Sequence, residues 1–204
     1  MSRRTLLSLL AGGVLVLFVL GIYAVMNPPR QGQAVNVAST GEARIGGPFT
    51  LVDTDGRTVD QSVLNGKWSV IFFGFTYCPD YCPATLQTMA RVEQELGPLA
   101  DNLQTVFISI DPERDTPQAL KAYLASDAFP DRVVGLTGSP EQVAATARAY
   151  GAVYERVGEG DDYTMNHSLV AYLMDPQGRF VLPLGHGLGP ERTAQVIRDA
   201  MERA

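Results

Sequence analysis

The sequence predicts an α/β fold in which helices cover both faces of a central sheet. Short apolar runs rich in β-branched and aromatic residues alternate with amphipathic segments at helical spacing, and a late strand pair is followed by a terminal helix. With 204 residues, of which 46% are hydrophobic, the chain is long enough for one such domain and a further segment.

The first half of the domain is expected to hold a hairpin, a buried strand and a helix. In "FTLVDTDGRTVDQ", apolar residues alternate around Asp55-Gly56, which is typical of a hairpin. "WSVIFFGF" has the length and composition of one buried strand. Apolar residues at helical spacing then predict a helix that Gly97 and Pro98 interrupt near its end; these residues are Leu86, Met89, Val92, Leu96 and Leu99.

The second half repeats the alternation of strand and helix. "LQTVFISID" and "RVVGLTG" predict strands, each followed by a helix that opens with a cap residue and a proline. These helices are "TPQALKAYLAS", with Thr116 as N-cap, and "SPEQVAATARAYG", which closes on Gly151. "SLVAYLMDPQGRFVLPLG" predicts two strands around a turn, and "GPERTAQVIRDAMERA" an amphipathic final helix.

The N-terminal segment is expected to anchor the chain in a membrane. Residues 6–26 are uncharged and apolar, and at about 1.5 Å per residue such a helix spans roughly 30 Å, the thickness of a bilayer core. A cleaved signal peptide is the alternative, although its apolar region is typically shorter. Two preceding arginines favour a cytoplasmic N-terminus at 1–5, with a flexible linker at 27–42 and an exported domain at 43–204.

The charge of the exported part excludes some classes of partner. Beyond the apolar run the chain has 14 basic residues (16 minus the two early arginines) and 22 acidic ones, a net charge of −8. No basic field is available to neutralise phosphate groups, so nucleic acids and anionic membrane surfaces are not expected as partners.

The only two cysteines of the chain, Cys78 and Cys82, lie close together where a strand is expected to give way to a helix. Unpaired N–H groups at a helix N-terminus favour thiolate over thiol, and Pro79 and Pro83 stiffen the loop. Three interpretations remain: a structural disulfide, a dithiol that exchanges electrons, or half of a metal site.

The chain has two histidines, and the first is the candidate third ligand. His167 precedes an expected buried strand, Leu169 to Met174, whereas His186 lies in a glycine-flanked loop. Two thiolates and an imidazole suit Cu(I), and a further weak ligand would suit Cu(II). Zinc is possible by ligand type, but a structural zinc site requires four protein ligands.

Three segments resemble the Sco/SenC family of membrane-anchored copper chaperones: "FFGFTYCPDYCP", "ISIDPERDTP" and "YTMNHSLVAYLMDPQGRF". The resemblance implies a thioredoxin-like fold with an added N-terminal β-hairpin, and copper bound by Cys78, Cys82 and His167. It also implies a single-pass protein of the bacterial inner membrane whose C-terminal domain is periplasmic. Its client would be the binuclear copper centre of cytochrome c oxidase subunit II, and another periplasmic protein could donate the copper.

Two positions depart from the family pattern. Tyr81 stands where the family usually has a branched aliphatic residue, and Asn166 where it usually has Asp, which removes a negative charge beside the expected metal. In "DPERDTP", Asp115 and Thr116 suit a turn and helix cap, whereas Asp111 is a candidate for a group that supports the copper ligands. The acidic run at 155–162 is expected to be a solvated loop.

Three functions are consistent with these residues. The first is copper delivery by ligand exchange, and the second is a thiol-disulfide reductase that keeps the cysteines of the partner reduced. The third is a redox or copper sensor. The first two are linked, because a disulfide between Cys78 and Cys82 cannot coordinate copper. Only the copper functions need His167.

Overall fold

The computed structural model describes residues 45–204. The N-terminus at 1–5, the anchor expected at 6–26, the linker expected at 27–42 and the first two residues of the expected domain lie outside this part of the chain. Among the residues that the structure describes, no helix has both the length and the apolar character needed to cross a membrane.

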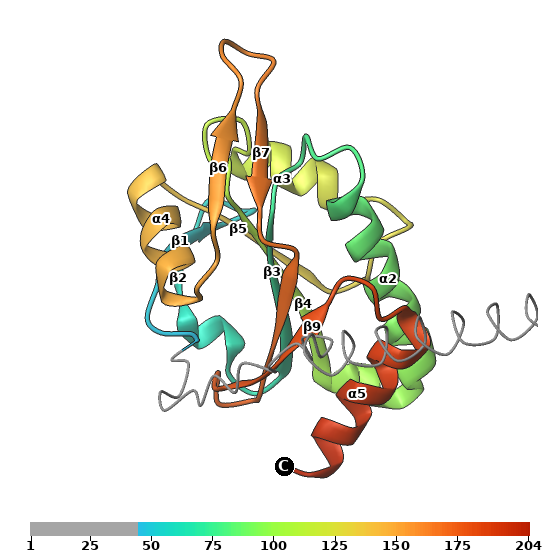
Figure 1. Cartoon of the computed structure of the whole chain (residues 1–204). Helices are drawn as coiled ribbons and strands as arrows, with labels where there is room; N and C mark the ends of the chain where they lie inside the picture. Colours follow the sequence, from blue (N-terminus) through green and yellow to red (C-terminus); the bar gives the residue numbers. More distant parts are fainter. Residues whose placement is uncertain (1–44) are drawn as a thin grey trace, which may run out of the picture. The chain divides into compact units, whose positions relative to one another are not determined.

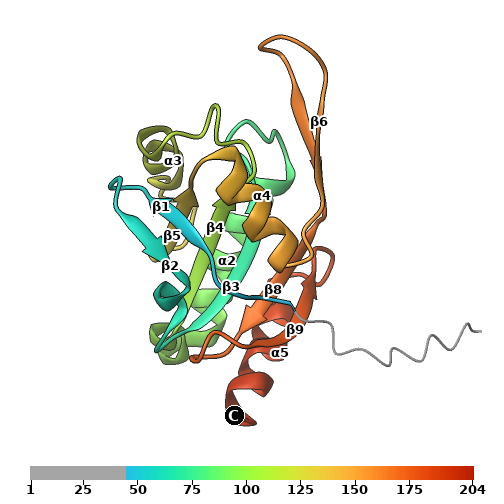
Figure 2. The same ribbon diagram turned by 90° about the vertical axis from the view of Figure 1, so that its left-hand side faces the viewer.

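A seven-stranded sheet forms the centre of the domain, with the order β2-β1-β5-β4-β3-β8-β9 (Figures 1 and 2). The three central strands β5, β4 and β3 are parallel, and every other pairing in this sheet is antiparallel. The strands are β1 (Thr50–Asp53), β2 (Thr58–Asp60), β3 (Trp68–Gly74), β4 (Leu103–Ser109), β5 (Val133–Thr137), β8 (Val170–Met174) and β9 (Phe180–Gly185). All residues of β3 and β4 are buried, as their apolar sequences predict.

Helices cover both faces of this sheet, which confirms the α/β prediction. Helices α2, α3 and α5 lie on one face and α4 lies on the other (Figures 1 and 2). The helices are α2 (Tyr81–Leu96), α3 (Pro117–Leu124), α4 (Pro140–Ala149) and α5 (Pro190–Glu202), and two short 3₁₀ helices span Gln61–Leu64 and Gly97–Asn102. Thr116 caps α3 by accepting a hydrogen bond from the Ala119 N–H, and Ser139 forms a capping box with Gln142 at α4.

A second, two-stranded sheet corrects one expectation. Strands β6 (Tyr154–Val157) and β7 (Thr164–His167) pair as an antiparallel hairpin that projects from the body of the domain (Figure 1). The acidic run at 155–162, expected to be a loop, therefore begins within a strand, and only its later part forms the turn. His167 is the last residue of β7 rather than part of a loop before β8.

Candidate metal centre

The two cysteines lie at the turn that joins β3 to α2. Cys82 lies in the first turn of α2, and Cys78 lies in the loop before it. The Cys82 N–H points to Cys78 Sγ at 3.4 Å, whereas the side chain of the N-cap residue Asp80 makes no capping bond. The Cys78 sulfur therefore takes the place of a helix cap.

A glycine at the end of β3 makes room for the second sulfur. A Cβ at Gly74 would lie only 2.6 Å from Cys82 Sγ and 3.0 Å from the Phe107 ring. Cys82 is 1% exposed, so its sulfur has little freedom to move away. The absence of a side chain at Gly74 thus leaves the space that Cys82 Sγ occupies.

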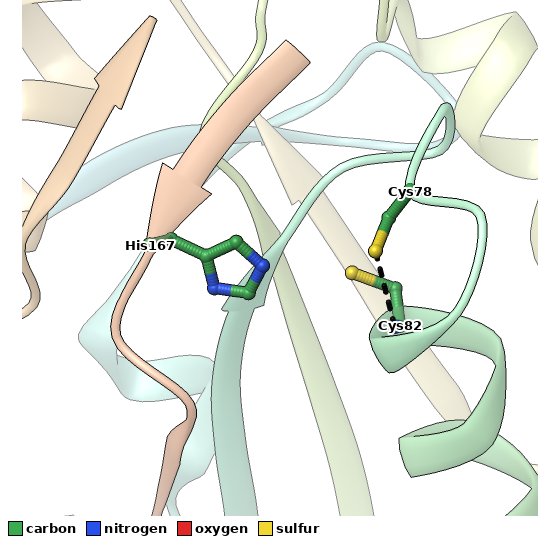
Figure 3. A group of neighbouring side chains, drawn as sticks. All are labelled: Cys78, Cys82 and His167. Atoms are coloured by element: carbon green, nitrogen blue, oxygen red, sulfur yellow. Dashed lines mark hydrogen bonds between the residues drawn. The ribbon is translucent and has the colours of Figure 1, made fainter. Parts of the chain in front are cut away.

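The hairpin brings His167 to the dithiol. Its Nδ1 lies 3.0 Å from the Ser168 carbonyl oxygen, which only accepts hydrogen bonds, so Nδ1 carries the proton. Nε2 is then the free nitrogen, and Figure 3 shows this far side of the ring turned toward both sulfur atoms. The Phe75 ring packs against the imidazole nearly perpendicular to it, with centroids 6.0 Å apart.

The three side chains form a group that suits a soft metal ion. One donor atom from each of Cys78, Cys82 and His167 lies within 4.8 Å of the other two. A point therefore exists within about 2.8 Å of all three atoms (4.8 Å divided by √3). This is about 0.5 Å longer than a typical zinc–sulfur bond and about 0.7 Å longer than a typical zinc–nitrogen bond. Small side-chain movements would close that gap, and thiolate with imidazole is a donor set that copper accepts.

The two thiols have opposite pKa shifts. The pKa of Cys78 is lowered to about 5, chiefly because the Cys82 thiol donates a hydrogen bond to its sulfur. Burial acts in the opposite direction, and hydrogen bonds from backbone N–H groups lower the pKa further. The pKa of Cys82 is raised, because its proton is held by the Cys78 sulfur and its side chain is buried. The lowered pKa favours the thiolate at Cys78 and the raised pKa favours the thiol at Cys82, so metal binding to both sulfur atoms would displace the proton of Cys82.

A stack of aromatic rings and guanidinium groups connects the dithiol loop to the hairpin. Arg114 lies 4.5 Å from the ring centroid of Tyr77, the residue before the first cysteine, and 3.6 Å from that of Tyr163. Arg156 of β6 also lies over Tyr163, at 3.7 Å. Arg114 donates to the Tyr163 carbonyl at 3.0 Å and pairs with Asp111 at 2.6 Å. These contacts link the loop that carries Cys78 to the hairpin that carries His167.

Asp115 is a supporting residue that sequence reasoning assigned to a different role. It does not cap α3; its buried carboxylate accepts hydrogen bonds from the Thr76 N–H at 3.0 Å, the Thr76 hydroxyl, and the Ser109 hydroxyl at 2.6 Å. Asp115 thereby fixes the loop that leads to Cys78. Burial raises its pKa against the effect of these donors.

The two other supporting candidates are Asp111 and Asn166. The Asp111 carboxylate accepts hydrogen bonds from Arg114 and the Tyr163 hydroxyl, so within residues 45–204 its side-chain partners belong to the stack. Asn166 is exposed and precedes His167 in β7, so the two side chains point to opposite faces of the hairpin. A role of either residue beside the metal stays a prediction.

Comparison with known proteins identifies relatives along most of the chain. A family model described as SCO1/SenC matches residues 37–202. The mitochondrial SCO1 homolog 1 of Arabidopsis thaliana is 44% identical over 148 residues, which cover 70% of this chain and 43% of that protein. The SCO2-like protein RC0895 of Rickettsia conorii is 36% identical over 190 residues, covering 92% and 91%. The chain spans about half the length of the mitochondrial relatives that it matches.

Solved structures agree with this relationship. The crystal structure of Arabidopsis thaliana ScoI with copper bound aligns with a TM-score of 0.74 and 38% identity, covering 78% of this chain and 99% of that one. BsSco, described as a member of the Sco family of cytochrome c oxidase assembly proteins with a disulfide switch, aligns with a TM-score of 0.61 and 26% identity, covering 76% and 90%. The expected thioredoxin-like α/β fold is therefore the fold of solved Sco proteins, and the chain belongs to the SCO1/SenC family.

Proposed function

We propose that this protein is a copper metallochaperone that binds one copper ion through Cys78, Cys82 and His167 and acts in cytochrome c oxidase assembly. The observation that carries the proposal is the convergence of the three donor atoms within 4.8 Å, from segments that are far apart in the sequence. Copper-bound structures of Sco relatives support it. Both oxidation states are compatible with the donor set: Cu(I) with these three ligands, and Cu(II) with a further weak ligand.

The proposed client is the binuclear copper centre of cytochrome c oxidase subunit II. The two thiols and the imidazole would pass copper to the client's own ligands by exchange, after receiving it from another periplasmic protein. The description of BsSco as a cytochrome c oxidase assembly protein supports this class of client. In a strain that lacks the chain, oxidase copper content should fall; the wild-type gene should restore it and the His167→Ala gene should not.

The proposed location is the bacterial inner membrane, with residues 6–26 as a single-pass anchor and the domain in the periplasm. The uncharged apolar run and the two arginines before it support this orientation. Carbonate extraction of cell membranes should leave the full chain in the pellet and release a chain that lacks residues 1–42. Release of the full chain by carbonate would contradict the anchor.

A thiol-disulfide reductase is the second candidate function, and the asymmetry of the two thiols favours it. Cys78 has a pKa lowered to about 5 and Cys82 has a raised pKa, the arrangement of an attacking thiolate beside a buried resolving thiol. Such an enzyme would keep the cysteines of the same subunit reduced. The reaction would oxidise Cys78 and Cys82 to a disulfide, so it competes with copper binding.

Anaerobic copper titration of the reduced full chain tests the ligand set. Wild type should bind one equivalent; His167→Ala should lose stoichiometric binding yet retain thiol exchange with a small disulfide. His186→Ala is the matched control, since it removes the other histidine of the chain and should leave the stoichiometry at one. Protein oxidised beforehand should take up no copper. Unchanged stoichiometry in His167→Ala would remove the histidine from the ligand set, and uptake by oxidised protein would remove both cysteines.

A further inference from the structure

A cavity beside the dithiol brings both histidines of the chain to one space. It is open to solvent on one side. The start of α2, the segment that joins β7 to β8, and the turn between β9 and α5 form its wall. Cys82 and His167 line it together with His186. The second imidazole therefore faces the same space as two of the proposed copper ligands.

His186 stands between two glycines, which permit a wider range of backbone conformations than other residues. It is exposed and follows directly after β9, between Gly185 and Gly187. A Cβ at either glycine would meet nothing within 4 Å, so there is open space beside the backbone on each side of His186. The ring of His167, by contrast, is oriented by the hydrogen bond of its Nδ1 to the Ser168 carbonyl.

The ring of His186 packs against the residue next to a proposed ligand. Its centroid lies 4.6 Å from that of Tyr81, with the rings at 60°. Tyr81 is the first residue of α2 and directly precedes Cys82. Tyr81, which departs from the family pattern, thus contacts His186, which is not a ligand of the proposed copper centre. This contact holds an imidazole in the cavity wall, against the start of α2.

We propose that His186 is an exchange ligand through which Cu(I) enters and leaves the Cys78–Cys82–His167 centre. On exit, a neutral imidazole nitrogen of His186 donates its electron pair to Cu(I) as the bond from His167 breaks; entry is the reverse. Copper remains Cu(I), and no proton is released. Associative exchange of this kind avoids stripping a ligand before its replacement has arrived. Tyr81 acts as a positioning residue, and the inference rests on the proposed copper function.

Stopped-flow transfer of Cu(I) from the loaded full chain to bicinchoninate tests the exchange step. His186→Ala should still bind one equivalent with unchanged equilibrium affinity, but its transfer rate should fall about tenfold or more. Tyr81→Leu should also slow transfer, whereas Tyr81→Phe keeps the ring and should restore the rate. Leu188→Ala is the matched control, because Leu188 is exposed on the same turn and lies outside the cavity wall.

The outcomes separate the exchange step from the proposed function. A transfer rate in His186→Ala that equals or exceeds the wild-type rate, with normal copper binding, overturns the role of His186 alone. A comparable loss of rate in Leu188→Ala does the same, since the effect would then belong to the turn. Failure of the wild-type chain to bind copper overturns the proposed function as well.

Discussion

Replacing Gly74 by alanine tests whether the packing behind Cys82 sets the position of a copper ligand. The new Cβ would lie 2.6 Å from Cys82 Sγ, whereas ordinary contact begins at 3.4 Å. The sulfur must therefore move by about 0.8 Å (3.4 − 2.6), or α2 must shift away from the sheet. The Phe107 ring, 3.0 Å from the same Cβ, limits relaxation on the other side.

Both stability and copper binding should respond to the added methyl group. Overpacking a well-filled core costs about 1–3 kcal/mol, and each kcal/mol lowers the unfolding midpoint by about 2–4 °C in a domain of this size. Ligand positions in metal sites are held to about 0.2 Å, so a shift of about 0.8 Å should weaken copper binding about 10–100-fold.

Gly135→Ala separates the two effects. Gly135 lies in β5, and a Cβ there would meet Leu124 at 2.5 Å and Thr54 at 2.9 Å, so the strain is comparable but no thiol is involved. Urea unfolding should show both variants destabilised, and anaerobic competition with bicinchoninate should show weakened Cu(I) binding in Gly74→Ala alone. Wild-type affinity in Gly74→Ala, or an equal loss in Gly135→Ala, would refute the reasoning.

Three further predictions concern the thiols and their supports. Iodoacetamide should modify Cys78 before Cys82. Because the thiolate predominates above the pKa, the reactivity of Cys78 should persist until the pH falls to about 5. Equal modification rates of the two cysteines, measured by mass spectrometry, would contradict the asymmetry. Arg114→Lys keeps the charge but loses the planar stack on Tyr163, so amide hydrogen exchange should accelerate in β6–β7 while β3 stays protected. An equal acceleration of exchange in all strands would contradict a local role of Arg114. Asp115→Asn replaces an accepting carboxylate oxygen by an amide NH₂ group, which cannot accept the hydrogen bonds of Thr76 and Ser109. The free energy of unfolding in urea should fall by about 1–3 kcal/mol. Wild-type stability would show that the carboxylate is dispensable.

The central strands and the helix starts could be predicted because their sequence patterns are local. Every residue of β3 and β4 is buried, so the sequence of each strand is a largely apolar run. The helices α3 and α4 each begin with a hydroxyl residue followed by proline, and both hydroxyls accept the expected capping bond. The position of the dithiol at a strand-to-helix turn followed from the same patterns.

The β6–β7 hairpin could not be predicted, because tertiary contacts hold it. Of the four residues of β6, Tyr154 is half-buried and the other three are exposed, so no regular alternation marks a strand. The contacts that hold it include Arg114, which donates to the Tyr163 carbonyl 49 positions away. The approach of His167 to the cysteines therefore followed from the family resemblance and not from any local pattern.

Asp115 shows how a strong local pattern conceals a long-range role. It stands next to Thr116 and Pro117, which form a genuine helix start, so a capping role was the simplest interpretation. The fold instead directs its carboxylate to Thr76, 39 positions earlier, in the loop before Cys78. Only the parallel neighbours β3 and β4, whose ends lie side by side, bring these residues together.

The proposed ligands lie on elements that are held in the fold with unequal stability, and we therefore expect His167 to leave copper first. Cys82 is 1% exposed on a helix packed against the main sheet, whereas His167 is half-buried at the end of a two-stranded hairpin outside that sheet. Two-stranded hairpins are marginally stable alone, so opening β7 costs less free energy than moving α2. In copper-free protein, amides of β7 should therefore exchange with solvent faster than those of β3, and copper should slow the exchange of β7. Equal protection of the two strands would mean that His167 is held as firmly as the thiols, and ligand exchange would then have to begin at Cys78.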